Sequence, residues 1–235
     1  IKIITGKIPL FKNFIDLRNV EPTHELIVIN VRLPRIILAA LVGAGLSVVG
    51  AAFQGMFKNP MADPYVLGVS SGAALGATVA LSGGVIERLM GPGGITLFAF
   101  SGAILTAILV YNAARVGNRV SPNTLLLAGV SISYLLSSIV SIIMVFNKDL
   151  IQNVVMWTMG SVSTASWKKV AILLPFVVIG SLIVLVFARD LNIMSTGDEA
   201  ARSLGINVER VKKILLVISS FIVAACVSVS GIIGF

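Results

Sequence analysis

The most regularly spaced polar residues in this chain of 235 residues lie between positions 196 and 207. Thr196 and Glu199 have the spacing of a capping box, in which a hydroxyl caps a helix and a carboxylate three positions later bonds back. Gly205 stands where a glycine would end that helix, and Asn207 can cap a second one. A short, rigid helix of this kind offers the chemistry of docking a soluble partner. The alternative is an ordinary solvated loop helix.

Arg32 and Arg35 stand three positions apart, just before a long apolar stretch. A guanidinium group binds a carboxylate through two parallel hydrogen bonds, so the pair could recognise acidic side chains of an external partner. Arginines at this position also anchor an apolar helix at a membrane interface. Both interpretations remain open.

Two prolines four residues apart, Pro60 and Pro64, prevent a continuous helix in this part of the chain. Asn59 and Asp63 precede them and can accept the backbone N–H bonds that the break releases. A tight capped loop explains the pattern. A loop that borders a polar passage also explains it, and would place Gln54, Asn59 and Pro60 along that passage.

Small side chains recur every four residues in two of the apolar stretches. In the later stretch, Ser133 and Ser137 belong to a stripe that suits close packing of helices or the lining of a polar passage. The earlier stripe, which we interpret as a packing face, comprises Gly68, Gly72, Gly76, Ala80 and Gly84.

The groups that catalysis and metal binding require are scarce. Cys226 is the only cysteine and His24 the only histidine, which excludes a disulfide framework and a His/Cys metal site within this sequence. The sequence has neither a G-x-x-x-x-G-K-[ST] motif nor an H-E-x-x-H motif. We therefore predict that the chain is not an enzyme and binds no cofactor directly, and that any ATP is used by a separate subunit.

The composition is that of a membrane protein. Hydrophobic residues make up 57% of the chain and charged residues 12%, with a mean hydropathy of +1.01. Soluble domains have about 25% charged residues. Although the net charge is +8, the basic residues are too thinly spread for a nucleic-acid-binding domain, so no nucleic-acid partner is expected.

Six stretches without Asp, Glu, Lys or Arg are each close to the roughly 20 residues that a helix needs to cross a bilayer. The sequence therefore predicts an all-α, polytopic membrane bundle that contacts lipid. The predicted spans are 36–57, 65–86, 94–114, 124–146, 170–187 and 214–235.

The basic residues predict the orientation. Loops 58–64, 115–123 and 188–213 carry 8 Lys and Arg, against 4 in loops 87–93 and 147–169. Because basic loops stay in the cytoplasm, the first set is expected there. Residues 1–35 are then an extracytoplasmic stretch, and residues 36–235 form the transmembrane domain. We also expect further segments upstream and downstream.

Several motifs together resemble the FecCD-type permeases, the membrane subunits of prokaryotic ATP-binding-cassette (ABC) importers for iron-siderophores, haem and cobalamin. The motifs are R-L-P-R at 32–35, L-V-G-A-G-L at 41–46, Q-G-M-F-K-N-P-M-A-D-P at 54–64, L-G-V-S-S-G-A at 67–73, L-L-L-A-G-V at 125–130, W-T-M-G-S at 157–161, G-D-E-A-A-R-S-L-G at 197–205 and S-G-I-I-G-F at 230–235. The resemblance implies six helices of a ten-helix permease in the cytoplasmic membrane. It also implies a second copy of the chain, two ATPase subunits inside and a substrate-binding protein outside.

The resemblance also implies roles for individual residues. Arg32 and Arg35 would face glutamates of the binding protein. The span from Thr124 would line the passage, with Ser121 and Pro122 near the cytoplasmic gate. Pro122 departs from the cobalamin permease, which has small hydroxyl residues there. The helix that couples to the ATPase would consist of Gly197, Asp198, Glu199, Ala200, Ala201, Arg202, Ser203, Leu204 and Gly205.

The alternative function is that of a secondary transporter driven by an ion gradient. Such transporters usually place an ionisable residue within the membrane, and none of the six predicted spans contains one. The sequence does not identify the cargo.

Overall fold

The computed structural model describes residues 22–83, 91–117 and 119–233, and most of them are helical. The elements, in chain order, are α2 (Pro22–Ile27), the π-helix η2 (Val28–Arg32), α3 (Leu33–Phe57), the 3₁₀ turn η3 (Pro64–Leu67), α4 (Val69–Gly83), α6 (Pro92–Ala114), β1 (Arg115–Val116), β2 (Arg119–Val120), α7 (Pro122–Phe146), the 3₁₀ turn η4 (Lys148–Leu150), α8 (Ile151–Thr158), α9 (Trp167–Val186), α10 (Ala188–Thr196), α11 (Asp198–Ser203) and α12 (Val208–Ser230). The two short strands pair as an antiparallel hairpin.

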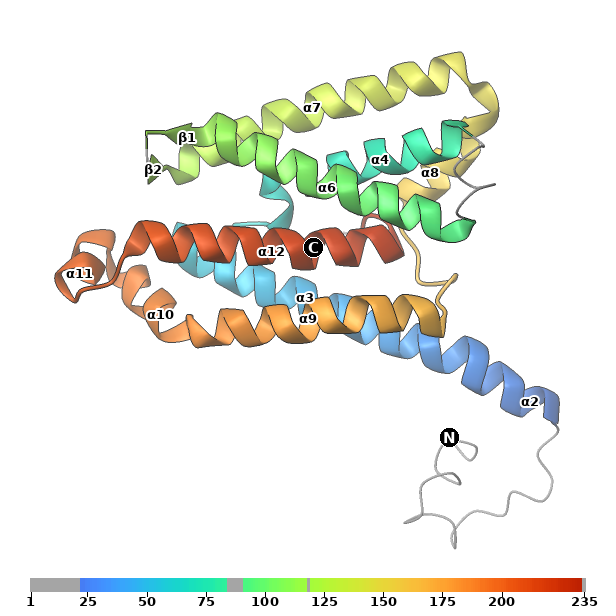
Figure 1. Cartoon of the computed structure of the whole chain (residues 1–235), viewed down its shortest axis with the longest axis horizontal. Coiled ribbons are helices and arrows are strands. Elements are labelled where there is room, and N and C mark those ends of the chain that lie inside the picture. Colours follow the sequence, from blue (N-terminus) through green and yellow to red (C-terminus); the bar gives the residue numbers. More distant parts are fainter. Residues whose placement is uncertain (1–21, 84–90, 118, 234–235) are drawn as a thin grey trace, which may run out of the picture.

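Helix α12 is the centre of the bundle. Figure 1 shows α4, α6 and α7 on one side of it and α3 and α9 on the other. In α12, 72% of the most apolar 18-residue segment is buried, against 17% in α7. Alanine and serine side chains in its second half leave space for neighbouring helices to approach. Helix α7, in contrast, packs through one face only.

Five helices of the described residues are long and apolar enough to cross a membrane: Thr23–Phe57, Gly93–Ala114, Pro122–Phe146, Trp167–Val186 and Val208–Ser230. They confirm the predicted helical membrane fold. The first helix begins before residue 36, so residues 22–35 of the stretch predicted to precede the membrane are helical, and residues 1–21 lie outside the described residues. The last does not continue to residue 235 as predicted, because the chain turns at Gly231, whose φ is +73°.

The predicted span 65–86 is wrong as a single long helix. Asp63 caps the η3 turn by accepting the N–H of Tyr65 at 2.7 Å, and Gly68, with φ +66°, separates this turn from α4. Within the described residues, helix α4 has 15 residues, which extend over less than a hydrocarbon core of about 30 Å. Residues 84–86 lie outside the described residues. The prediction from uncharged stretches missed the break because Gly68 interrupts the helix without introducing a charged residue.

Glycines bring the backbones of α4 and α6 into direct contact. A Cβ atom on Gly102 of α6 would collide with the carbonyl group of Gly72, and one on Gly76 of α4 would collide with the carbonyl group of Phe98. These contacts confirm the packing interpretation of the earlier glycine stripe, apart from Gly84, which lies outside the described residues. Dispersion between closely spaced backbones holds helices together where lipid offers little hydrophobic drive.

A second glycine contact joins the turn after α8 to the end of α12. Gly160 and Gly231 both have positive φ, and a Cβ on Gly231 would come within 2.8 Å of the Cα of Gly160. Beside them, the N–H of Ser161 donates to the carbonyl of Ser230 at 2.7 Å. The two turns therefore lie backbone against backbone.

The loops divide between two ends of the bundle. Helices α10 and α11 and the hairpin lie at one end, and α2 and α8 lie toward the other (Figure 1). An ion pair between Lys58 and Asp198 places the loop after α3 at the first end. The three loops predicted to be cytoplasmic thus share one end, as an alternating membrane topology requires.

We predict that Gly102→Ala destabilises the bundle because the added methyl group meets backbone that cannot rotate away. Overpacking of this kind costs about 1–3 kcal/mol. The expected result is a lower melting temperature in detergent, followed by tryptophan fluorescence. Gly93→Ala in the same helix is the control, since no neighbouring atom lies within 4 Å of its added Cβ. Equal losses in the two variants would contradict this role of Gly102.

Candidate functional site

The end of the molecule that carries α11 is built on α3. Helix α10 buries Leu191 and Met194, which are 9% and 0% exposed. The Cδ2 atom of Leu191 lies 3.7 Å from the position that a Cβ on Gly55 would take. Leu191 therefore packs against the last turns of α3 at an ordinary van der Waals distance, which would also accommodate an alanine at position 55.

The start of α11 differs from the predicted capping box. Thr196 is the last residue of α10, and its hydroxyl donates to the carbonyl of Ile193 at 2.8 Å. The residue that precedes α11 is Gly197, with φ +155°, and no side chain caps the helix there. The predicted box was wrong because α10 extends through Thr196 and uses its hydroxyl.

The end of α11 agrees with the prediction. Gly205 has φ +84° and its N–H donates to the carbonyl of Arg202, while the N–H of Ile206 donates to the carbonyl of Ala201, both at 3.0 Å. These bonds form a Schellman motif, in which a glycine ends the helix. Asn207 then caps α12 by accepting the N–H of Arg210 at 3.1 Å. Helix α11 is thus joined to α12 by a short, fixed turn.

Asp198 is held by two lysines from different parts of the chain. Its Oδ1 atom lies 2.7 Å from Nζ of Lys58, just after α3, and its Oδ2 atom lies 2.6 Å from Nζ of Lys212, in α12. We call this arrangement the Asp198 clamp. Lys58 adopts left-handed backbone angles, with φ 53°, and is the only such non-glycine residue among those described. The sequence did not predict either partner.

The clamp sets the charge state of Asp198. Burial of the carboxyl raises its pKa, but the hydrogen bonds and positive charges of Lys212 and Lys58 lower it further, and the net shift is downward. Asp198 is therefore ionised at neutral pH. Because its folded pKa lies below the unfolded value, the clamp stabilises the fold above about pH 4 and is lost as pH falls through the lowered pKa.

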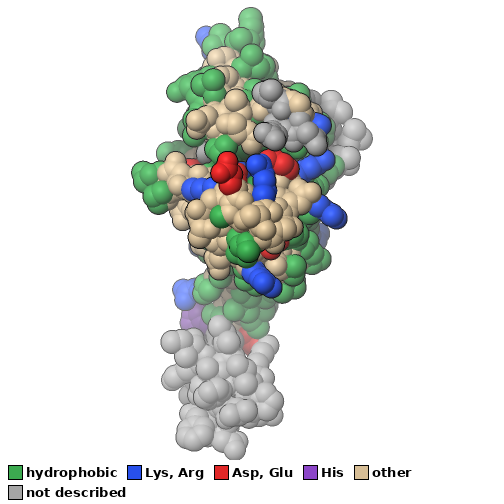
Figure 2. All heavy atoms as spheres, turned by 90° about the vertical axis from the view of Figure 1, so that its left-hand side faces the viewer, with side chains coloured by type: hydrophobic (Ala, Val, Ile, Leu, Met, Phe, Trp, Pro, Cys, Tyr) green, Lys and Arg blue, Asp and Glu red, His purple; other side chains and the backbone are tan. Residues whose placement is uncertain are grey.

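Helix α11 presents a mixed surface at this end of the molecule. Ala201, on the inner side of the helix, is fully buried. Glu199, Ala200 and Ser203 are exposed, and Leu204, which directly follows the helix, is 69% exposed. Arg202 pairs with Glu209 of α12 at 3.1 Å. Figure 2, which views this end directly, shows acidic and basic side chains close together. A rigid helix with an exposed apolar tip beside paired charges is suited to seat in a groove of another protein.

Arg32 and Arg35 lie toward the opposite end of the bundle, and both are exposed. Nη2 of Arg35 donates to the carbonyl of Ser163 at 2.9 Å, which ties the start of α3 to the loop before α9. Nearby, the indole N–H of Trp167 donates to the carbonyl of Ile29 at 3.1 Å. Arg35 is therefore partly engaged within the chain, whereas Arg32 forms no side-chain hydrogen bond or ion pair with the other residues that the structure describes.

The residues at the proline break form a compact turn. The side chain of Asn59 accepts the N–H of Met61 at 2.9 Å, and Pro60 is exposed beside it. Gln54 is half-buried in the last turn of α3, and its carbonyl accepts the N–H of Asn59 at 3.2 Å. These contacts show an ordered, capped loop, and the loop lies beside the clamp through Lys58.

Ser121 and Pro122 begin α7 next to the hairpin. Pro122 occupies the first helical position, where its fixed φ and missing N–H are tolerated. The carbonyl of Ser121 accepts the hydroxyl of Thr124 at 2.9 Å. Both residues are exposed at the same end as α11.

The two serines predicted to line a passage face different ways. Ser133 is half-buried, with its Oγ atom 3.1 Å from where a Cβ on Gly68 would lie, so it faces the start of α4. Ser137 is exposed on the free face of α7, which also carries Tyr134, 73% exposed. Other exposed hydroxyl residues of this helix are Ser131, Tyr134, Ser138 and Ser141, and the predicted passage residues did not include them. The sequence feature that could have identified them is their place on the helix face opposite the buried residues Leu125, Gly129, Leu136 and Val140.

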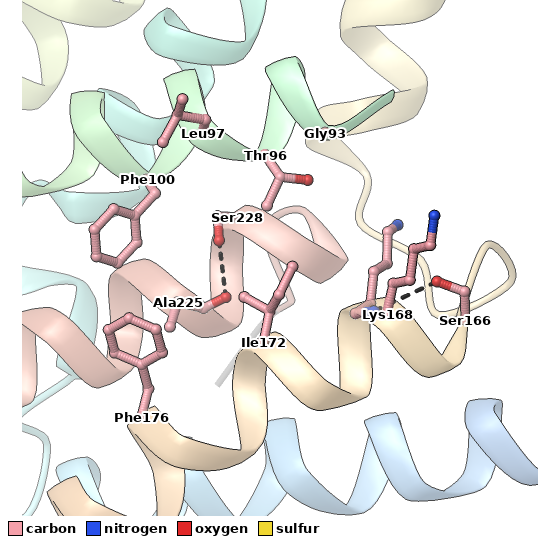
Figure 3. Close-up of a pocket in the computed structure, with 11 residues that line it drawn as sticks. Gly93, Thr96, Leu97, Phe100, Ser166, Lys168, Ile172, Phe176, Ala225 and Ser228 are labelled. Atoms are coloured by element: carbon pink, nitrogen blue, oxygen red, sulfur yellow. Dashed lines mark hydrogen bonds between the residues drawn. The ribbon is translucent and has the colours of Figure 1, made fainter. Parts of the chain in front are cut away.

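The structure also contains a cavity of about 510 Å³ between α6, α9 and α12. Figure 3 shows Phe100 of α6 and Phe176 of α9 on its inner wall, with Lys168 near one edge. The two rings lie 5.5 Å apart between centroids. Its lining is chiefly apolar, and sequence analysis did not predict it.

The described residues thus form a bundle of long apolar helices that carries the short charged helix α11 at one end. A family model described as the FecCD transport family matches residues 1–235. The chain belongs to the FecCD family. FecCD membership and the helices described above make it a multi-pass membrane protein.

Curated relatives carry names of import permeases. The chain is 42% identical over 216 residues to the cobalamin import system permease protein BtuC of Halobacterium salinarum, a match that covers 92% of this chain and 58% of the relative. It is 40% identical over 216 residues to the uncharacterised ABC transporter permease protein YvrB of Bacillus subtilis, which covers 92% of this chain and 61% of YvrB. For the hemin transport system permease protein HmuU of Yersinia pestis, the identity is 37% over 217 residues, covering 88% and 62%. The chain thus spans about 60% of the length of the FecCD relatives it matches.

A solved structure shares the fold. It is described as an inward-facing conformation of a transporter assigned to the metal-chelate type of ABC transporter. Its TM-score to this chain is 0.82 at 29% sequence identity, and the match covers 99% of this chain and 73% of the other. The described helices therefore share the helical membrane fold of that ABC transporter.

We predict that Asp198→Asn loosens α11, because an amide cannot form the two ion pairs. The loss of stability should be small, about 0.5–1 kcal/mol, since the groups are partly exposed. A nitroxide label on Ser203→Cys reports the mobility of α11 by electron paramagnetic resonance, and the only native cysteine, Cys226, is buried. The label should be more mobile in Asp198→Asn at pH 7. In the wild type it should become mobile only below about pH 4.

Asp190→Asn is the matched control for this measurement. Asp190 lies in α10 at the same end and forms no ion pair within the described residues. The label should keep its wild-type mobility in this variant. Equal mobility in Asp198→Asn and the wild type across the pH range would show that the clamp does not hold α11.

Proposed function

We propose that the chain is the membrane-spanning part of the permease subunit of an ABC importer, in the cytoplasmic membrane of a prokaryote. Its substrate class would be iron-siderophore, haem or cobalamin, as the names of FecCD relatives suggest for those proteins. The observation that carries the proposal is the fixed attachment of α11 to two membrane helices, in a chain with the FecCD fold. In this proposal residues 188–213 face the cytoplasm and the stretch before residue 36 lies outside.

Residues Gly197–Gly205 would seat in a groove of a separate ATPase subunit, which binds and hydrolyses ATP. The support is geometric: α11 is short, ends in a Schellman turn and is clamped through Asp198 to the ends of α3 and α12. A displacement of α11 by the ATPase would therefore act on both helices together. Coupling of this kind is a rigid-body transition between two states of the bundle.

Arg32 and Arg35 would bind acidic side chains of an extracytoplasmic substrate-binding protein. Both guanidinium groups are exposed at the end opposite α11, where such a protein would meet the permease. The bond from Arg35 to the carbonyl of Ser163 uses one Nη atom and holds the guanidinium in place. Among the described residues, nothing accepts a hydrogen bond from the Arg32 guanidinium, so its donors are available to such a protein.

Helix α7 would line the passage together with the same helix of a second copy. Its free face carries the hydroxyl groups of Ser131, Tyr134, Ser137, Ser138 and Ser141 among exposed apolar side chains such as Leu127 and Leu135. These hydroxyl groups are the support for the proposal, since contact with lipid does not require them. The hydroxyl of Ser138 donates to the carbonyl of Tyr134 at 2.9 Å, which leaves its oxygen free to accept a bond from a passing polar group. Ser121, Pro122, Gln54, Asn59 and Pro60 would border the cytoplasmic exit, whereas Ser133 faces α4 and supports packing.

We predict that replacing residues 197–205 with a flexible Gly-Ser run abolishes the complex between the full-length permease and its ATPase, because the groove then meets no ordered helix. Co-purification in mild detergent measures the complex. A Gly-Ser replacement of Lys148–Leu150, at the opposite end, is the control and should keep the complex. Retention of the ATPase by both variants would refute the role of α11. Absence of a complex even in the wild type would favour the ion-gradient alternative.

We further predict that Arg32→Glu combined with Arg35→Glu weakens docking of the binding protein by about tenfold or more, because like charges then face each other. Surface plasmon resonance on permease in nanodiscs measures the dissociation constant. ATPase association should not change. Lys148→Glu reverses an exposed charge elsewhere on the same end and should have little effect. An unaltered constant in the double variant would reject both arginines as docking residues.

A further inference from the structure

A basic cavity lies beside α11, at the end of the bundle that carries the hairpin. It has a volume of about 230 Å³ and opens between the hairpin and the first turns of α12. Arg115, Arg210, Lys212 and Lys213 line it, together with one carboxylate, Glu209. The cavity is therefore formed mainly by cations from two elements that are far apart in the sequence.

The ion pairs leave this cavity with excess positive charge. Lys212 is engaged with Asp198, and Glu209 is engaged with Arg202, outside the cavity. Within the described residues, no carboxylate forms an ion pair with Arg210 or Lys213. Both side chains are exposed and can turn toward a bound anion.

An apolar groove continues from the basic cavity along the membrane helices. Its volume is about 270 Å³, and it shares Tyr111 of α6 and Leu216 of α12 with the cavity. Ile108 and Val217 form its rim and are 51% and 46% exposed. The groove is thus a strip of hydrocarbon surface that leads directly away from a group of cations.

The junction between cavity and groove lies where the apolar helices end. Arg115 directly follows the last residue of α6, and Lys213 directly precedes the uncharged run that begins at Ile214. In a membrane this is the level of the lipid headgroups. Basic pockets between transmembrane helices at this level bind anionic headgroups.

We propose that the cavity and the groove together bind one anionic phospholipid between α6 and α12. Arg210 and Lys213 contact the headgroup phosphate, Asn207 and the start of α12 lie beside it, and an acyl chain occupies the groove past Leu216. Charge complementarity and the continuity of the two spaces select this occupant. A free phosphate would leave the groove unused, and an acidic protein segment would not enter it.

The cavity in Figure 3 fits this ligand less well. Its lysines lie toward the opposite end of the bundle, and the ammonium of Lys169 already donates to the hydroxyl of Thr164 at 2.9 Å. Its chiefly apolar lining offers little to a charged headgroup.

The test measures lipid binding to the full-length permease in detergent by native mass spectrometry. The probes are phosphatidylglycerol and phosphatidylcholine with identical acyl chains. Wild-type protein should bind phosphatidylglycerol about thirtyfold more tightly than phosphatidylcholine, the preference expected from two basic residues at the headgroup. Arg210→Gln combined with Lys213→Gln should weaken phosphatidylglycerol binding by about thirtyfold, given the typical contribution of two basic residues, and should leave phosphatidylcholine unchanged.

Two further variants separate this site from its surroundings. Arg189→Gln removes a cation at the same end but outside the cavity, and it should bind phosphatidylglycerol like the wild type. Ile108→Trp fills the groove and should weaken the binding of phosphatidylglycerol, although it leaves the residues of the basic cavity unchanged. Lys212 is left unchanged because it also holds Asp198.

Several results would overturn the proposal. One is equal affinity for the two lipids, and another is full competition by inorganic phosphate, which would indicate an anion site without a lipid. A third is loss of ATPase binding in the Arg210→Gln, Lys213→Gln variant with unchanged phosphatidylglycerol affinity, which would assign the cations to a protein partner. A fourth is a cross-link from Ile108→Cys to another helix of the full-length protein, which would show that protein fills the groove.

Discussion

Asp198 joins three segments that pack into one end of the bundle. Its two carboxylate oxygens bond to lysines that follow α3 and that lie in the second turn of α12, so α11 has a fixed place relative to both helices. A short helix of 6 residues has little stability of its own in water. The position of α11 therefore depends on these charges, on its Schellman turn and on the burial of Ala201.

The two faces of the bundle have different physical requirements. Helix α12 is buried on most sides, so its neighbours can approach only because its second half carries small residues. Helix α7 is packed along one face, and its other face is free to carry hydroxyl groups. The core is thus held by close backbone contact, whereas the exposed face of α7 carries hydroxyl groups among apolar side chains.

Much of the fold followed from the distribution of charge along the sequence. Charged residues are excluded from long stretches because their burial in lipid is costly, and five of the six stretches became long apolar helices. The turn at Gly205 and the cap at Asn207 were also predictable, since each depends on bonds within a few residues. The break at Gly68 was not, because an uncharged glycine leaves hydropathy unchanged. The clamp was beyond sequence reasoning for a simpler reason: Lys58 lies 140 residues from Asp198.

The contact between Gly160 and Gly231 has a mechanical consequence for the end opposite α11. Two turns that touch through their backbones, with a hydrogen bond from Ser161 to Ser230, have no side chains between them that could change rotamer and absorb a displacement. A shift of α12 along its axis would therefore move the turn after α8 directly, through backbone contact. The far ends of α8 and α12 can advance or retreat only in step.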